Sequence, residues 1–161
     1  MFRRLIRTSN DPTLLITRLI LGIVFFAHGA QKVLGWFGGG GFDQTMGFFT
    51  GMGIPAFLAV LAIAAEFLGG LGLIVGFLGR VAALGIIVNM VVAIFAVHLP
   101  YGMFMNWFGN QTGEGFEYHL LAIATGLVTL IHGSGLFSVD AAIDRALAER
   151  HTRIGFDRKV A

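Results

Sequence analysis

Four long apolar runs are the feature of this sequence that most restricts its fold. They cover residues 12–34, 55–77, 81–99 and 117–132, and segments rich in glycine or polar residues separate them. Each run has about 20 residues, the length with which a helix crosses a bilayer core of about 30 Å. Hydrophobic residues make up 56% of the chain and charged residues 12%, and the mean hydropathy is +0.81. The sequence therefore predicts an all-α fold, an integral membrane four-helix bundle.

The positions of the cationic side chains predict the orientation. The loops 35–53 and 100–116 contain no Lys or Arg. The cations that flank the apolar runs are Arg3, Arg4, Arg7, Arg80, Arg145, Arg150, Arg153, Arg158 and Lys159. Because cytoplasmic segments are rich in Lys and Arg, we expect both termini in the cytoplasm. The expected organisation is a basic leader over residues 1–13, a membrane domain over 14–133, and an amphipathic helix with a basic tail over 134–161.

Ionisable side chains inside the apolar runs are the first functional candidates. Arg18, His28 and Lys32 share one edge of the first helix, and Glu66 lies in the second. A charged group at the centre of a membrane helix costs about 2.5–3.5 kcal/mol on insertion scales, so these groups need partners. Arg18 is the nearest permanent cation to Glu66 in depth, and we expect the two to form an ion pair. His28 with Glu66 could alternatively act as a proton relay.

More polar side chains lie near the opposite ends of the helices. His98 ends the third run, and Glu117 and His119 open the fourth. Together with Lys32 they are expected near the outer rim, where they could bind a ligand. Simpler interpretations remain open: Lys32 could extend to the interface, His98 could mark it, and Glu117 at a helix N-terminus is favourable through the helix dipole alone.

Metal chemistry is only weakly indicated. The chain contains no cysteine, which excludes thiolate metal sites, iron–sulfur clusters and disulfides within it. His28, His98 and His119 fall at similar depth, so two of them could hold a haem, or they could form a hard-ligand site with Glu66 or Glu117. Because no local ligand spacing supports either arrangement, neither a metal site nor haem is predicted.

Several sequence blocks resemble one family. Arg18 leads to FFAHGAQKVLG, and GIPAFLAVLAIAAEFLGGLGLIVGFLGRVAA, His98-x-x-x-Gly102, GEGFEYHLL and GSGLFSVD follow in order. Over residues 13–140 this arrangement resembles the DoxX family. The resemblance implies a small four-helix protein of the bacterial inner membrane. It also implies kinship with the DoxD type, a membrane subunit of thiosulfate:quinone oxidoreductase, and with members that associate with thiol or superoxide defence proteins.

Two functions from different classes follow as expectations. The first is a membrane subunit associated with an oxidoreductase that binds a quinone or similar lipid-soluble ligand, with His28 and Glu66 in catalytic roles. Its ligand-binding residues would be Arg18, Lys32, His98, Glu117 and His119. The alternative is a non-enzymatic scaffold that recruits a soluble redox or stress-defence enzyme; a permease is a weaker third. The expected partners are the lipid bilayer, an oxidoreductase subunit or a second copy of the chain, and not nucleic acid.

Overall fold

The structure, a computed structural model, describes the backbone of residues 2–160 and the side chains of residues 2–149. Every regular element in this part of the chain is helical, which confirms the predicted all-α class. The α-helices are α1 (Phe2–Ile6), α2 (Thr13–Leu34), α3 (Gly41–Gly51), α4 (Ala56–Val75), α5 (Gly79–Ala93), α6 (Glu117–His132) and α7 (Val139–Val160). Three short turns join them: η1 (Trp36–Gly38), η2 (Ile94–His98) and η3 (Leu99–Tyr101).

Three helical segments have the length and apolar composition to cross a membrane. They are α2, α4 and the segment Gly79–Tyr101, which contains α5, and they correspond to the first three apolar runs. α6 has 16 residues, a length of about 24 Å, which is shorter than the roughly 30 Å of a bilayer core. It packs against α2 and α5 in the same bundle. A fourth crossing at α6 therefore stays a prediction.

Glycine residues allow α2 and α4 to pack with their backbones close together. A Cβ atom added at Gly29 would lie 2.4 Å from the Cα atom of Phe67, and one added at Gly70 would lie 2.4 Å from the backbone nitrogen of Phe26. Neither position can therefore hold a larger side chain without separating the helices. Small residues at helix contacts are the common means of close packing in membranes. This crossing fixes the position of Glu66 on α4 relative to Lys32 on α2.

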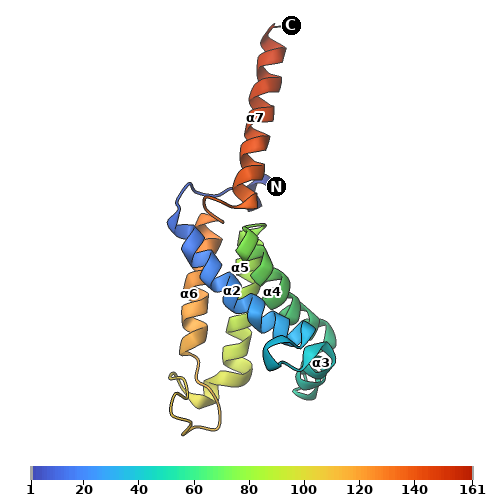
Figure 1. Cartoon of the computed structure of the whole chain (residues 1–161), viewed down its shortest axis with the longest axis vertical. Helices are drawn as coiled ribbons and strands as arrows, with labels where there is room; N and C mark the ends of the chain where they lie inside the picture. The colour runs from blue at the N-terminus through green and yellow to red at the C-terminus, as the bar shows by residue number, and fades with distance from the viewer. Residues whose placement is uncertain (1, 161) are drawn as a thin grey trace.

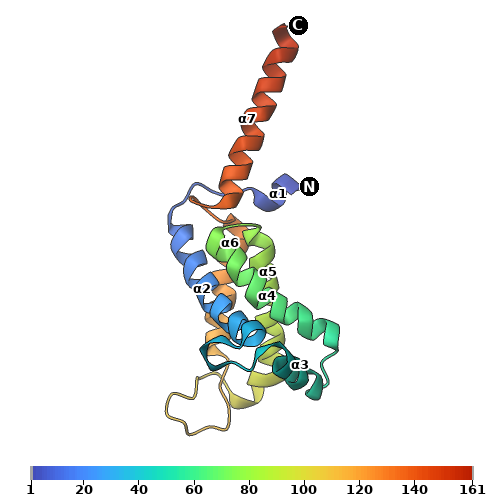
Figure 2. The same ribbon diagram turned by 45° about the vertical axis from the view of Figure 1, so that its right-hand side comes forward.

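The two described ends of the chain lie at the same end of the bundle (Figure 1). There α1 lies beside the first part of α7 (Figure 2), and Arg3 Nε donates to the Asp144 carboxylate at 2.8 Å. α7 leads away from the bundle and spans Val139–Val160, within the segment expected to form an amphipathic helix and a basic tail. α3 and the loop 102–116 occupy the opposite end. The expected cations Arg150, Arg153, Arg158 and Lys159 lie outside the residues whose side chains are described.

The third predicted helix changes its winding before it ends. α5 stops at Ala93, and Ile94–His98 continues as a π-helical turn before η3. Pro100 lies in η3 and has no backbone N–H for a further α-helical hydrogen bond. A π-helical turn contains more residues than an α-helical turn, so it rotates the side chains that follow. His98 at the end of this turn consequently faces α6.

We expect reporter fusions to place both ends of the bundle on their predicted sides. Fusions after Arg80 and at Ala161 should report the cytoplasm, and fusions at Gly39 or Gly109 should report the outside. The physical reason is the confinement of the flanking cations to one side of the apolar runs. An external signal from Ala161 together with a cytoplasmic signal from Arg80 would instead mean that α6 does not cross.

Candidate functional site

Arg18 is buried at the end of the bundle from which α7 starts. Its side chain is 1% exposed and donates hydrogen bonds to four backbone carbonyls. Nε binds the Ser134 oxygen at 2.9 Å, Nη1 binds the Leu73 oxygen at 2.7 Å and the Ile74 oxygen, and Nη2 binds the Phe137 oxygen at 2.8 Å. The guanidinium thus occupies carbonyl groups that the end of α4 and the loop after α6 leave free.

Asp140 completes this arrangement, which we call the Arg18 clasp (Arg18, Ser134 and Asp140). The Asp140 carboxylate accepts hydrogen bonds from the backbone nitrogens of Leu78 at 2.8 Å and Gly79 at 3.0 Å, at the start of α5. It also accepts from Ser134 Oγ at 2.6 Å and interacts electrostatically with Arg18. The clasp joins α2, the α4–α5 turn and the first turn of α7. Arg18 therefore stabilises the contact between these elements.

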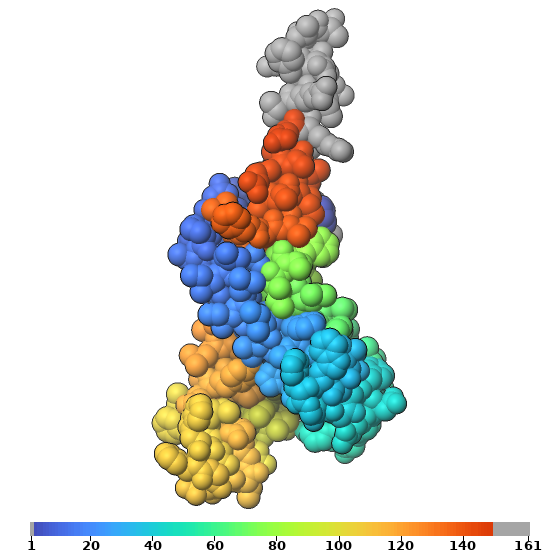
Figure 3. Space-filling model, viewed as in Figure 1, coloured from blue at the N-terminus to red at the C-terminus, as the bar shows by residue number. Residues whose placement is uncertain are grey.

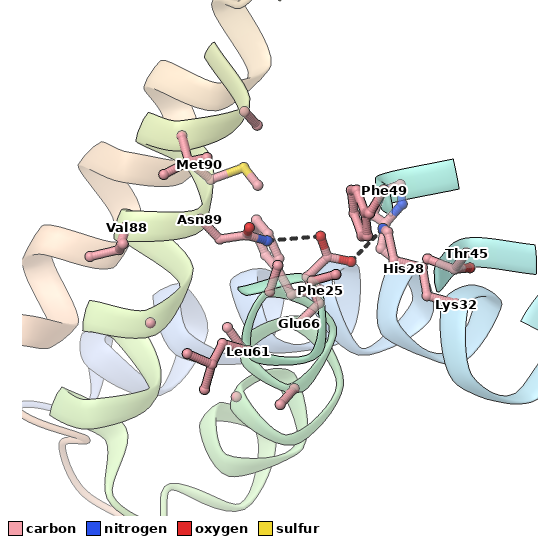
Figure 4. Close-up of a pocket in the computed structure, with 18 of the residues that line it drawn as sticks. Phe25, His28, Lys32, Thr45, Phe49, Leu61, Glu66, Val88, Asn89 and Met90 are labelled. Atoms are coloured by element: carbon pink, nitrogen blue, oxygen red, sulfur yellow. Dashed lines mark hydrogen bonds and ion pairs between the residues drawn. The ribbon is translucent and has the colours of Figure 1, made fainter. Parts of the chain in front are cut away.

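Glu66 lies in the middle of α4 and pairs with other residues. Its carboxylate accepts from Lys32 Nζ on α2 and, at 2.9 Å, from Asn89 Nδ2 on α5. Glu66 is 6% exposed, and Figure 4 shows it between Asn89 and the α2 side chains. We call these three residues the Glu66 cluster. The predicted ion pair between Arg18 and Glu66 is therefore wrong: backbone carbonyls bind the guanidinium, and Lys32 supplies the cation.

A large cavity adjoins the Glu66 cluster. Its volume is about 1630 Å³, and its walls come from α2, α3, α4, α5, η2 and the first turn of α6. α4 and α5 diverge toward the end of the bundle that carries α3 (Figure 1), and the molecular surface is recessed between α3 and the loop 102–116 (Figure 3). The wall includes exposed apolar side chains of both helices: Leu61, Leu68, Leu84 and Val88. In a bilayer, this side of the cavity faces the lipid chains.

Polar side chains from several helices meet at the inner part of the cavity wall. Five of the seven predicted site residues line it: His28, Lys32, Glu66, His98 and His119. Arg18 and Glu117 do not belong to the lining. The His28 ring centroid lies 6.3 Å from that of Tyr118 on α6, and Tyr118 in turn lies 6.4 Å from the buried Phe25. The cavity is thus apolar along the α4 and α5 faces and polar where α2, α4, α5 and α6 meet.

The π-helical turn η2 brings two histidines together. The ring centroids of His98 and His119 are 4.1 Å apart, and His98 Nδ1 lies 2.8 Å from the Glu114 carbonyl oxygen. That carbonyl can only accept, so Nδ1 of His98 is the donor in this hydrogen bond. His119 is 6% exposed, and its Nδ1 has no hydrogen-bond partner among the described residues.

Glu117 anchors the loop 102–116, which we call the outer loop after its predicted side, and does not belong to the cavity lining. Its Oε1 atom accepts from the indole nitrogen of Trp107 at 3.0 Å and from the backbone nitrogen of Met105 at 3.2 Å. Among the described residues, no group of three His, Cys, Asp or Glu side chains could hold a metal ion. The alternative of a hard-ligand site built from three histidines with Glu66 or Glu117 therefore has no support in this geometry.

Sequence reasoning missed four residues of these sites: Asn89, Tyr118, Ser134 and Asp140. Asn89 is the one strongly polar side chain in the interior of the third run, a signal that could have suggested a partner for Glu66. Tyr118 lies between two predicted site residues in the sequence. Asp140 follows the apolar runs, and nothing in its local pattern indicates that it caps α5.

Comparisons with known proteins agree with this architecture. The family model described as DoxX matches residues 13–99. The chain is 31% identical to "Putative oxidoreductase CatD" of Bacillus subtilis over 78% of this chain and 83% of the relative. It is 30% identical to "Inner membrane protein YqjF" of Escherichia coli, over 84% of this chain and 95% of the relative. It is 31% identical to "Uncharacterized membrane protein Rv3486" of Mycobacterium tuberculosis, over 94% of this chain and 91% of the relative.

No solved structure shows a significant match to the chain. The family model covers α2, α4 and α5, and it includes all three residues of the Glu66 cluster and the clasp residue Arg18. The relatives extend the similarity across most of their own length. On this evidence the chain belongs to the DoxX family.

Proposed function

We propose that this protein binds a quinone or a similar lipid-soluble ligand in the cavity, as the membrane subunit associated with an oxidoreductase. The observation that carries the proposal is the position of the Glu66 cluster on the wall of an otherwise apolar cavity whose α4 and α5 faces meet lipid. A ligand with an apolar tail and a polar ring could enter from the bilayer and place only the ring against the cluster. Ligand sites generally combine an apolar lining with a few oriented polar groups.

The donors of the cluster fit a ring that carries carbonyl oxygens. Lys32 has three N–H donors, and its bond to Glu66 uses one of them. The others can bind an acceptor oxygen in the cavity. The volume of about 1630 Å³ exceeds the roughly 300–1,000 Å³ of common small-molecule sites. There is room for a substituted ring and part of an alkyl chain.

A bound quinone would supply two-electron redox chemistry, which no side chain of this cysteine-free protein provides. The protein's own residues would bind the ring and manage protons. Lys32 and His28 are placed to donate hydrogen bonds to a ring oxygen, and Glu66 can accept or return a proton beside them. Electrons would come from a partner. The name of the Bacillus subtilis relative, an oxidoreductase, supports that association, and the Escherichia coli relative supports a place in the inner membrane.

We expect a soluble quinone with a decyl tail to raise the melting temperature of the purified protein in detergent. A ligand present at 100 times its Kd adds about 2.7 kcal/mol to the free energy of unfolding. His28→Ala should remove most of this shift, because His28 lines the cavity. The matched control is His132→Ala, an exposed histidine of α6 outside the cavity lining, which should keep the shift. Absence of any shift in the unmodified protein would contradict the proposal.

A second candidate function is a scaffold that recruits a soluble enzyme at the outer loop. The loop exposes Phe104 by 67%, Trp107 by 79% and Phe108 by 88%, while Glu117 and Glu114 hold its backbone through hydrogen bonds to Met105 and Asn106. Exposed aromatic side chains on a loop held in this way could bind a partner protein or insert into the membrane interface. Loss of partner co-purification on replacing Trp107 and Phe108 by Ser, with no ligand-induced shift in melting, would favour the scaffold.

A further inference from the structure

Two neighbouring polar atoms on the first turn of α6 are buried and have no hydrogen-bond partner among the described residues. They are the Tyr118 hydroxyl and His119 Nδ1. Both residues line the cavity, and their ring centroids lie 5.5 Å apart. Buried polar groups are nearly always hydrogen-bonded in folded proteins, so an unpaired one needs an explanation. Because both residues line the same cavity, a ligand held there is the candidate partner for the two unpaired atoms.

We propose that Tyr118 and His119 form a second hydrogen-bonding subsite, for a second oxygen of the ligand head group. This inference rests on the proposed function and makes it more specific. The Glu66 cluster would bind one ring oxygen from the side of α2, α4 and α5, and the α6 subsite would bind another. The ligand class is then a ring with two oxygens, such as a 1,4-quinone, and not a lipid with one carbonyl.

The hydrogen-bonding capacity of the subsite suits both redox forms of such a ring. A phenolic hydroxyl can donate to a quinone carbonyl or accept from a hydroquinone hydroxyl, and a neutral imidazole nitrogen can do either according to its tautomer. Lys32 can only donate. The buried Phe25, whose ring centroid lies 6.4 Å from that of Tyr118, adds an aromatic wall for the ring. His98 Nδ1 bonds the Glu114 carbonyl, so that nitrogen is already engaged outside the subsite.

α6 also contains a matched control for this proposal. Thr129 Oγ1 is a second buried hydroxyl without a partner among the described residues, and Thr129 is 1% exposed. It does not belong to the cavity lining. Tyr118→Phe and Thr129→Val each remove one unpaired hydroxyl from the same helix with little change of shape. Any effect of losing a buried hydroxyl on the fold should appear in both, whereas an effect on the ligand should appear only at Tyr118.

The experiment measures the Kd of 2-decyl-1,4-benzoquinone and of 2-decylcyclohex-2-enone, which has one carbonyl, by titration of the full-length protein in detergent. We expect Tyr118→Phe to weaken quinone binding about tenfold, the effect of one lost hydrogen bond. Thr129→Val should leave the Kd unchanged. The one-carbonyl ligand should bind the unmodified protein about tenfold more weakly than the quinone, and Tyr118→Phe should not weaken it further.

The outcomes separate this inference from the proposed function. If the unmodified protein binds the quinone and Tyr118→Phe binds it equally well, the subsite is refuted and the cavity site stands. If both ligands lose affinity equally on Tyr118→Phe, the tyrosine only shapes the cavity, and the subsite is again refuted. If neither ligand binds the unmodified protein, both proposals fail. If Tyr118→Phe does not fold, the affinities of the unmodified protein for the two ligands decide. Equal Kd values for the quinone and the one-carbonyl ligand would refute the subsite.

Discussion

Replacing Lys32 by Met is expected to lower the free energy of unfolding by about 3–5 kcal/mol, because it leaves the Glu66 carboxylate buried without its cation. Glu66 is 6% exposed, and among the described residues the Asn89 amide is the one other donor to its side chain. Glu66→Gln should cost less, since a glutamine oxygen still accepts from Asn89 and Lys32 is partly exposed. Unfolding monitored by circular dichroism in detergent measures both changes.

The double variant Lys32→Met/Glu66→Gln should lower the free energy of unfolding by clearly less than the sum of the two single changes, because it removes both charges together. Arg18→Gln combined with Glu66→Gln serves as the control and should be additive, since Arg18 bonds backbone carbonyls and not Glu66. The opposite result would contradict this arrangement: non-additive losses for Arg18 and Glu66, with additive losses for Lys32 and Glu66. It would mean that Arg18 pairs with Glu66, as depth alone predicted.

The positions of the helices were predictable because long apolar runs admit few solutions in a membrane. A backbone in lipid must satisfy its own hydrogen bonds, so each run becomes a helix whose ends fall at glycine, proline or polar residues. The first, second and fourth predicted helices accordingly agree with α2, α4 and α6 to within about two residues at each end. The π-helical turn after Ala93 was not predictable, since periodicity does not distinguish an α-helical turn from a π-helical one.

The partner of Glu66 was not predictable because depth along the membrane normal is only one coordinate. Arg18 is near Glu66 by that measure, but two carbonyls at the end of α4 and two in the loop after α6 offer the guanidinium four acceptors. Lys32 was expected near the outer rim, whereas the close crossing of α2 and α4 at Gly29 and Gly70 brings it to Glu66. Which face of α2 meets α4 is decided by tertiary packing.

The gathering of cavity residues was only partly predictable. Polar side chains within apolar runs are functional candidates on energetic grounds, and this reasoning found His28, Lys32, Glu66, His98 and His119. The same reasoning also selected Arg18 and Glu117, which bond the backbone of the clasp and of the outer loop. An ionisable group that satisfies backbone carbonyls or amides looks the same in sequence as one that faces a ligand. The unpaired Tyr118 hydroxyl could be recognised only from the packing around it.

The Arg18 clasp has a role that the cavity residues do not share. Asp140, on the first turn of α7, bonds the start of α5, and its backbone nitrogen donates to the Gly76 oxygen at 2.9 Å. Ser134 connects the Asp140 carboxylate with the Arg18 guanidinium. The first turn of α7 is thus tied to the bundle through buried hydrogen bonds, whereas the exposed Arg3–Asp144 pair adds only about 0–1 kcal/mol.

Arg18→Met is therefore expected to lower the free energy of unfolding by about 3–5 kcal/mol. The change leaves Asp140 without its neighbouring cation and removes the arginine donor from each of the Leu73, Ser134 and Phe137 carbonyls. Arg18→Lys should restore only part of the loss, because an ammonium group has fewer donors and lacks the planar fork of a guanidinium. Denaturation in detergent measures the loss, and limited proteolysis within residues 134–149 should accelerate as α7 detaches.

The matched control for Arg18→Met is Arg145→Met. Arg145 is an exposed arginine of α7 whose Nε atom bonds the Ala141 oxygen within the same helix, and surface substitutions of this kind stay within about 0.5 kcal/mol. Because Arg18 does not line the cavity, Arg18→Met measured well below its melting temperature should keep the Kd for the decyl quinone. Equal stability of the Arg18 and Arg145 variants would show that the clasp does not hold α7. A lost ligand affinity in a folded Arg18→Met protein would show that the clasp and the cavity are energetically coupled.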